Sequence, residues 1–168
     1  MTQGIPVQLD TSQGIPVQVT NLVAKWAQFA AQNPTGTNSL TYVCMGMGSV
    51  LKFTPAITGN YFIIVTYQYI NATNANKGSV EFIYDLVSNG VPANGNAVPG
   101  TATQFGPVHS LMQLGGTGST PTHVSCFQYW LSGLTVGSQY YLDIGLESVT
   151  NATVSTVKNV NVTIEETP

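Results

Sequence analysis

Beyond Gly36 the chain is a series of short apolar runs separated by turn residues. The runs are rich in β-branched and aromatic residues, as in YFIIVTYQYIN at residues 61–71. Runs of this length and composition between turns predict β-strands. We expect eight strands, at residues 40–45, 49–54, 61–71, 79–87, 101–112, 122–132, 139–148 and 153–165.

Eight short strands without long helices predict an all-β fold, a two-sheet β-sandwich or jelly roll. The turns agree, because Gly and Asn, which tolerate positive φ, separate the runs at residues 58–60, 76–78, 89–90 and 136–138. The glycine-rich residues 115–119 (GGTGS) are expected to be an exposed loop.

Leu134, Gly137 and Tyr140 have the spacing of a tyrosine corner. In this arch, a Tyr at the start of a strand returns its hydroxyl to the backbone a few residues upstream. The feature predicts a Greek-key sandwich and is structural, not chemical.

Residues 21–36 link this body to the N-terminal segment and predict a short helix. Asn21 is a candidate N-cap, and Asn33-Pro34 a stop. One helical face would carry Leu22, Trp26, Phe29 and Ala30. An extended segment is the alternative, because Trp26 and Phe29 also suit a strand.

Residues 1–20 contain a repeat, TQGIPVQLD at 2–10 and SQGIPVQVT at 12–20. Pro6 and Pro16 exclude a central strand, while the alternation of apolar and polar residues predicts an extended arm or edge strand. Fully extended, 20 residues reach roughly 65 Å. We expect an anchoring arm that pairs with the sheet edge of another protein; a disordered tail is the alternative. The anchoring residues would be Ile5, Pro6, Val7, Ile15, Pro16 and Val17.

A chain of 168 residues suits a single folded domain, here residues 37–168, with the arm and the linking segment before it. The N-terminus has neither the basic nor the apolar region of a secretory signal, and no run is long enough to span a membrane. We expect a virion protein assembled in the host cytoplasm, unless a signal has already been removed.

Charge is scarce: Lys and Arg together number 4 and Asp and Glu 7, so charged residues make up 7% of the chain. Soluble domains typically have roughly 25%. Nucleic acid is not an expected partner, because phosphate binding requires clustered basic residues. The four lysines are scattered, at Lys25, Lys52, Lys77 and Lys158.

No residue pattern predicts catalysis. A nucleophile, base and acid could be drawn from six residues without any local signature: Cys44, Cys126, His109, His123, Asp85 and Asp143. No clustered metal-ligand spacing occurs, and the glycines of residues 46–49 (GMGS) lack the context of a dinucleotide loop. We therefore expect a non-enzymatic protein with no metal and no cofactor.

The remaining polar residues are expected to be structural. Glu81 and Asp85, like Asp143 and Glu147, are four residues apart and predict a solvated strand face rather than a catalytic pair. The two cysteines are expected to be buried thiols. We interpret the glycosylation sequons at Asn71, Asn151 and Asn161 as chance occurrences.

Aromatic residues are frequent and permit two interpretations. They could stack on a neutral sugar or, as we prefer, pack across strands and between subunits. The residues concerned are Tyr61, Tyr67, Tyr69, Tyr84, Tyr129, Trp130, Tyr140 and Tyr141.

Four segments in fixed order resemble small phage and prophage structural proteins. They are residues 51–65 (LKFTPAITGNYFIIV), 92–101 (PANGNAVPGT), 133–144 (GLTVGSQYYLDI) and 159–166 (NVNVTIEE). The corresponding patterns of that group are F-T-P-x-x-[ST]-G, P-x-N-G-x-A-x-x-G-T and G-L-T-x-G-x-x-Y-[YW]-x-D-[IL], followed by the terminal strand. The resemblance spans residues 41–166. One departure is residues 84–90, YDLVSNG where relatives carry Y-G-T-G.

The resemblance implies a homotrimeric jelly roll of the tumour-necrosis-factor-like type, found in capsid decoration proteins, head fibres and tail fibres. It implies no catalytic residues. The implied partners are further copies of the chain and a major capsid protein or other virion protein. We favour capsid decoration; the alternative is a tail-fibre tip that binds host glycans through residues 88–99 or 115–119. A monomeric extracellular carbohydrate-binding module is the third possibility, and an enzyme the last.

Overall fold

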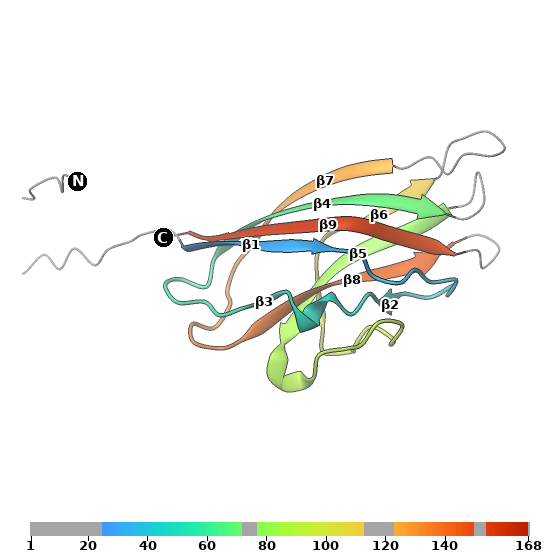
Figure 1. The fold of residues 1–168 in the computed structure, drawn as a ribbon. Coiled ribbons are helices and arrows are strands. Elements are labelled where there is room, and N and C mark those ends of the chain that lie inside the picture. Colours follow the sequence, from blue (N-terminus) through green and yellow to red (C-terminus); the bar gives the residue numbers. More distant parts are fainter. Residues whose placement is uncertain (1–24, 72–76, 113–122, 150–153, 168) are drawn as a thin grey trace, which may run out of the picture.

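Two antiparallel sheets packed face to face form the described part of the molecule (Figure 1). The computed structural model describes residues 25–71, 77–112, 123–149 and 154–167. Sheet A has the strand order β1 (Lys25–Gln32), β9 (Ser155–Glu166), β4 (Tyr61–Asn71) and β7 (His123–Leu131). Sheet B has the order β2 (Val43–Cys44), β8 (Tyr140–Ser148), β5 (Lys77–Leu86) and β6 (Thr103–Met112), and β3 (Lys52–Phe53) also pairs with β8. Two single-turn 3-10 helices are η2 (Met47–Ser49) and η3 (Val87–Asn89).

The strand order is that of a jelly roll. β2 and β3 both pair with β8, so they act as one strand interrupted by η2. Counted in this way, the two sheets have the orders 1-8-3-6 and 2-7-4-5, which two Greek keys generate. The predicted all-β sandwich is confirmed, and each of the eight expected segments contains an observed strand.

The helix predicted within residues 21–36 is wrong for the described residues, because Lys25–Gln32 is strand β1. Ala27 and Phe29 pack against the core, while Gln28 and Ala30 between and beyond them are exposed. This period of two fits the ladder with β9, whose edge would otherwise lack a partner. The extended alternative is therefore the observed one.

The core between the sheets is dominated by aromatic rings. Along β4 every second residue from Tyr61 to Tyr69 is buried, as pleating requires of a strand with one face on the core. Phe82 of β5 stacks on Phe127 of β7 across the two sheets, with ring centroids 4.6 Å apart. Such a contact fixes how the sheets lie on one another, because offset-stacked rings add to the free energy of burial.

Sheet B is also covered on its outer face, so β8 is buried on both sides. The cover consists of residues 34–50 and 91–101, which join each other where the Cys44 N–H donates to Asn96 O (2.7 Å) and the Gly95 N–H donates to Cys44 O (2.8 Å). Gly46 permits this contact, since it has a φ of 70° and a Cβ would lie 2.5 Å from Asn94 N. The glycines of residues 46–49 thus serve close backbone approach.

One carboxylate fastens the end of sheet A to a loop. Glu166, the last residue of β9, accepts backbone N–H bonds of 2.8–3.1 Å from the four successive residues Ala56, Ile57, Thr58 and Gly59. Burial alone would raise the pKa of Glu166, but these four donors outweigh it and lower the pKa to about 2. The loop between β3 and β4 is therefore shaped around this anion.

We expect the substitution Glu166→Gln to lower the free energy of unfolding by about 2 kcal/mol at pH 7, because an amide replaces a charged acceptor of several hydrogen bonds. Urea unfolding measures this value. Lys77→Gln removes a charge from an exposed residue of β5 and should leave the unfolding midpoint unchanged. Equal midpoints for the two variants would contradict the anchoring role of Glu166.

Candidate interaction surface

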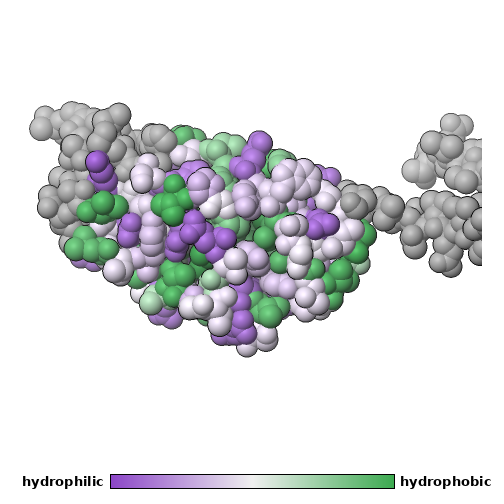
Figure 2. All heavy atoms as spheres, turned by 180° about the vertical axis from the view of Figure 1, so that it is seen from behind, coloured by the Kyte–Doolittle hydropathy of each residue, from purple (hydrophilic) through white to green (hydrophobic). Residues whose placement is uncertain are grey.

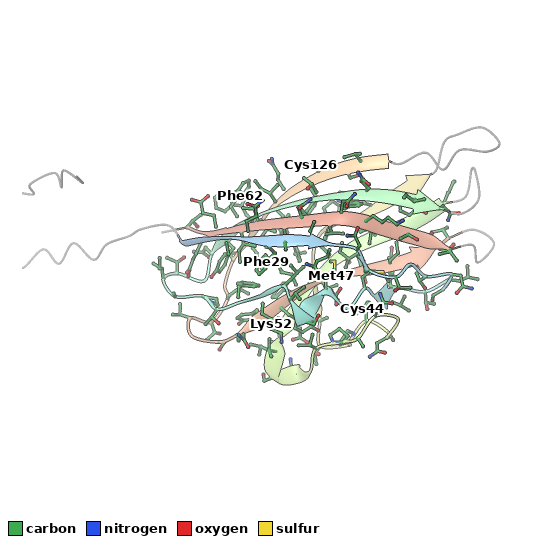
Figure 3. All side chains as sticks on the ribbon, in the orientation of Figure 1. Phe29, Cys44, Met47, Lys52, Phe62 and Cys126 are labelled. Atoms are coloured by element: carbon green, nitrogen blue, oxygen red, sulfur yellow. The ribbon has the colours of Figure 1, made fainter. Side chains whose placement is uncertain are left out.

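The two cysteines lie in different sheets and are both free thiols (Figure 3). Cys44 of β2 is buried, and burial, together with the nearby Asp143 and Glu81 charges, raises its pKa to about 12. Cys126 is exposed on β7, so the expectation of two buried thiols is wrong for this residue. Its side chain points outward because it alternates with the buried Phe127.

His109 of β6 lies among aromatic rings. Its ring centroid is 5.0 Å from that of Phe127 and 5.6 Å from that of Phe82, in both cases edge to face. Burial lowers its pKa, and its Nε2 atom is buried without a hydrogen-bond partner. The side chain of His123 is outside the described residues. Cys44 lies on β2 and His109 on β6, at opposite edges of sheet B, so the described geometry does not bring them together.

The four central carboxylates share the outer face of sheet B, as their register on β5 and β8 requires. The predicted solvated face is wrong, because the cover of residues 34–50 and 91–101 buries Asp85 and Asp143 and partly buries Glu81 and Glu147. Asp85 accepts bonds from Asn89 Nδ2 (2.7 Å) and Thr101 Oγ1 (2.6 Å). These acids hold covering segments in place.

Asp143 is the most deeply buried of the four. Burial raises its pKa to about 6, although the N–H groups of Ile144 (2.7 Å), Met47 (3.2 Å) and Gly48 (3.4 Å) donate to it and partly offset the rise. Burial, followed by the neighbouring Glu147 charge, also raises the pKa of Glu81. Within the described ranges, no three His, Cys, Asp or Glu side chains gather as a metal site.

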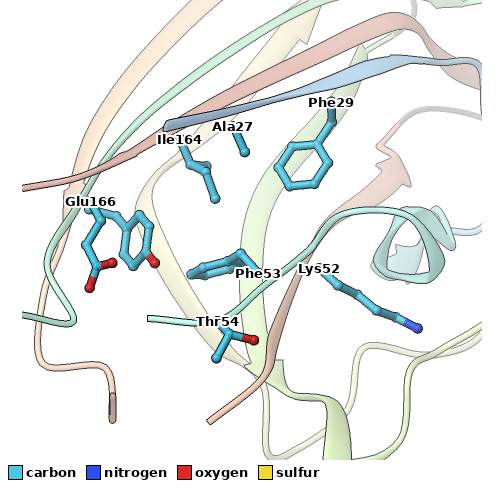
Figure 4. Close-up of a pocket in the computed structure, with 8 residues that line it drawn as sticks. Ala27, Phe29, Lys52, Phe53, Thr54, Ile164 and Glu166 are labelled. Atoms are coloured by element: carbon cyan, nitrogen blue, oxygen red, sulfur yellow. The ribbon is translucent and has the colours of Figure 1, made fainter. Parts of the chain in front are cut away.

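A cleft of about 230 Å³ opens between β1 and β3 (Figure 4). Its walls are mainly apolar, with Phe29, Phe53, Tyr61 and Ile164 contributing most of the lining. Glu166 also borders it, but its carboxylate is already bonded to the loop, and Lys52 points away from the rings. The cleft can accept a small apolar group and offers no acid–base pair.

Tyr140 begins β8, and its hydroxyl accepts the N–H of Thr135 at 3.0 Å. Leu134 beside it is buried, and Gly137 has a φ of 84° in the intervening turn. The arch is structural, as its spacing suggested. Asn71, one of the three sequons, is fully buried and thus closed to glycosylation in the folded domain.

The predicted anchoring residues, Ile5 to Val7 and Ile15 to Val17, lie outside the described residues. So do Asn151 and the loop at residues 115–119. No helix among the described residues is long and apolar enough to cross a membrane.

The strand register defines an outer face of sheet A that is largely neutral. It carries alternate residues of β4, β7 and β9, including Phe62, Ile64 and Trp130. Phe62 and Trp130 lie opposite each other with ring centroids 5.0 Å apart, and Trp130 is 60% exposed. Among the described side chains of this face, only Lys158 and Glu165 are charged, and they lie toward opposite ends of β9.

Figure 2 shows the opposite view of the molecule from Figure 1. There, separate hydrophobic groups lie between neutral and hydrophilic ones rather than in one continuous apolar patch.

The sequence of residues 61–71 already indicates that the outer face of β4 is unusual, because it departs from the alternation of apolar and polar residues expected of a strand with one face in solvent. Phe62, Ile64 and Ile70 are apolar at positions that point away from the core. A strand that is apolar on both faces is typical of one covered on both faces. The outer side of β4 is therefore more apolar than a solvent-exposed strand face requires.

No family model matches the chain, and no curated protein matches it. Among solved structures, it is similar to the D431N mutant VP2 protein of infectious bursal disease virus in derived T=1 particles, at a TM-score of 0.41 and 8% identity. It is also similar to the VP2 subviral particle of that virus, at a TM-score of 0.39 and 6% identity. These matches cover 97% and 86% of this chain but 36% and 33% of those chains, so the chain spans about a third of their length. Likenesses at these scores establish no common family or function.

Asp143 predicts a pH dependence of stability. Its pKa in the folded state, about 6, lies above the ordinary 3.8, so its stabilising contribution is complete below about pH 4 and lost as the pH rises through 6. The variant Asp143→Asn has no carboxyl at this position, so it does not lose this stability as the pH rises. The stability of the variant relative to wild type should therefore be about 2–3 kcal/mol more favourable at pH 7.5 than at pH 4.

Urea unfolding at the two pH values measures this difference. Glu166 changes the stability over a lower pH range. Because its pKa is lowered in the folded state, its stabilising contribution is lost as the pH falls through 4.5 toward 2. Lys77→Gln, at an exposed position of β5, is the control and is expected to follow the wild-type curve. If the free energy of unfolding depended on pH in the same way in D143N and wild type, burial of Asp143 would not be the cause of this pH dependence.

Proposed function

We propose that this protein is a non-enzymatic virion structural protein, a homotrimer that decorates a capsid and is anchored to it by residues 1–20. The neutral outer face of sheet A carries the proposal. A face that carries Phe62, Ile64 and Trp130 exposes apolar surface that a second protein surface would bury. Subunit interfaces are enriched in such aromatic residues and depleted of charge.

Self-association through this face accounts for the charge distribution. The only charged residues among the described side chains of this face are Lys158 and Glu165, and both lie near its ends. Few charges would therefore be desolvated in the contact. With 7% charged residues in the whole chain, many copies can also pack on one particle with little mutual repulsion. The motifs at residues 51–65, 92–101 and 133–144 support a trimer, because the phage proteins that they resemble are trimeric jelly rolls.

The arm supplies the attachment. The arm precedes β1, and an extended segment with apolar residues at every second position can add to a sheet edge of another protein. Three arms on one trimer would bind together, so that modest contacts give a stable attachment through effective concentration. The mechanism is therefore adhesion across neighbouring capsid subunits.

A tail-fibre tip that recognises host glycans is the second candidate. The exposed Trp130 beside Phe62, with the neutral Gln128 on the same strand face, is the kind of surface on which a sugar ring stacks. A glycan array distinguishes the two functions, because a decoration protein gives no saturable binding.

Ile64→Lys places a charge at the centre of the outer face of sheet A. We expect the mass measured by light scattering with size exclusion to fall from three times 17.8 kDa to that of the single chain, because an unpaired ammonium would be buried in the contact. Gln104→Lys, at an exposed position of β6, is the matched control and should stay trimeric. A wild-type monomer, or a trimeric I64K protein, would refute this placement of the interface.

Deletion of residues 1–20 is expected to leave a folded trimer that no longer binds capsids, because the sandwich and its outer face are unchanged. Occupancy on isolated capsids, measured by sedimentation and gel densitometry, should fall at least tenfold. Equal occupancy of the truncated and full-length proteins would exclude the arm as the anchor.

A further inference from the structure

Strand β7 is a sheet edge without the usual protection. β4 is the only strand among the described residues that pairs with β7, at one end of sheet A. Its sequence, HVSCFQYWL, contains no Pro, Gly, Lys, Arg, Asp or Glu, the residues with which proteins block exposed edges. The neighbouring edge strand β6, by contrast, is interrupted by Pro107 and by a bulge at Gly106, where φ is 72°.

Aromatic side chains line the opening between β6 and β7. Tyr129 stacks on Phe127 along β7, with ring centroids 5.9 Å apart, and lies 5.8 Å from Phe105 of β6. Tyr129 is nevertheless 36% exposed, and the unpartnered Nε2 of His109 is buried beside Phe127. An added strand that brings apolar side chains and one polar group would cover this opening.

Residues 12–20 have the pattern of such a strand. Successive residues of a strand direct their N–H groups to opposite edges. Pro16 has no N–H, so one donor is missing from the edge of the even-numbered residues, while the edge of the odd-numbered residues keeps all its donors. The odd-numbered side chains Ile15, Val17 and Val19 are all apolar and share one face, with Gln13 as the polar group on that face. The repeat at residues 2–10 has the same arrangement, because the spacing of ten is even.

We propose that residues 12–20 of one copy add as an extra strand to β7 of a neighbouring copy, with their odd-numbered edge toward β7. The repeat matches the 9 residues of β7 in length. Its apolar row covers the exposed part of Tyr129. This inference rests on the proposed self-assembly and leaves residues 2–10 as the anchor to the capsid.

The distance across sheet A assigns the strand to a neighbour. Lys25 pairs with Glu166, Glu166 with Tyr61 and Tyr61 with Leu131, so the start of β1 and the end of β7 are three strands apart on one row. A strand beyond β7 is one spacing further, about 19 Å from Lys25. The five residue steps from Thr20 to Lys25 span at most about 18 Å, too little for the repeat to lie along its own β7.

A pair of proline substitutions in the full-length protein tests the proposal. Val17→Pro removes an N–H from the pairing edge, whereas Gln18→Pro removes one from the opposite edge. Hydrogen–deuterium exchange of peptides from His123–Leu131 should become at least tenfold faster in V17P and remain as in wild type in Q18P. Equal exchange in V17P, Q18P and wild type would overturn the pairing.

A cross-link to the exposed Cys126 identifies the copy. Under mild oxidation, Gln18→Cys should form a disulfide that joins two chains, seen as a covalent dimer on a non-reducing gel, while Val17→Cys, on the other strand face, should not. A disulfide within a single chain, or cross-linking of both variants alike, would contradict exchange of the arm between copies. Deletion of residues 1–10 should abolish capsid binding and leave the exchange of His123–Leu131 as in wild type, so a failure of this proposal is distinguishable from a failure of the anchor.

Discussion

The contact between the Glu166 carboxylate and four successive backbone N–H groups holds together the end of the sandwich. β9 lies between β1 and β4, so whatever fixes its last residue also fixes the two strands that pair with it. The same contact orders the loop that leads from β3 in sheet B to β4 in sheet A. A single anion thus ties the two layers at one end, in a chain with few charges to spare.

The buried acids are hydrogen-bonded, and charge is sparse on the outer face of sheet A. Asp85, Asp143 and Glu166 are buried and bonded to backbone or side-chain donors, and they organise the cover of sheet B and the loop after β3. The outer face of sheet A, by contrast, is neutral over most of its area. This division is the one expected of a domain that uses its acids for internal structure and its outer sheet for contact.

The fold was predictable from sequence to the extent that it depends on local pattern. Runs such as residues 61–71 and 139–148, bounded by Gly and Asn, correspond to β4 and β8 within a few residues. β1 was not predicted as a strand, because the spacing of Trp26, Phe29 and Ala30 suits a helix, and only the open edge of β9 decides otherwise. The burial of Asp143 depends on residues 34–50 folding over β8, a long-range relation that local spacing does not show. The exposure of Cys126 depends on which face of β7 lies on the core, and local spacing does not show that either. The candidate surface was predictable only in part, from the apolar residues at both parities of β4.

The row Lys25–Glu166–Tyr61–Leu131 gives the sandwich two unlike poles. The start of β1 and the end of β9 lie at one pole (Figure 1). The ends of β4, β6 and β8 and the starts of β5, β7 and β9 lie at the other. A peptide fused after the end of β9 would therefore be carried at the same pole as the start of β1. A peptide inserted between the end of β4 and the start of β5 would be carried at the opposite pole, which makes that pole the choice for presenting an epitope away from the start of β1.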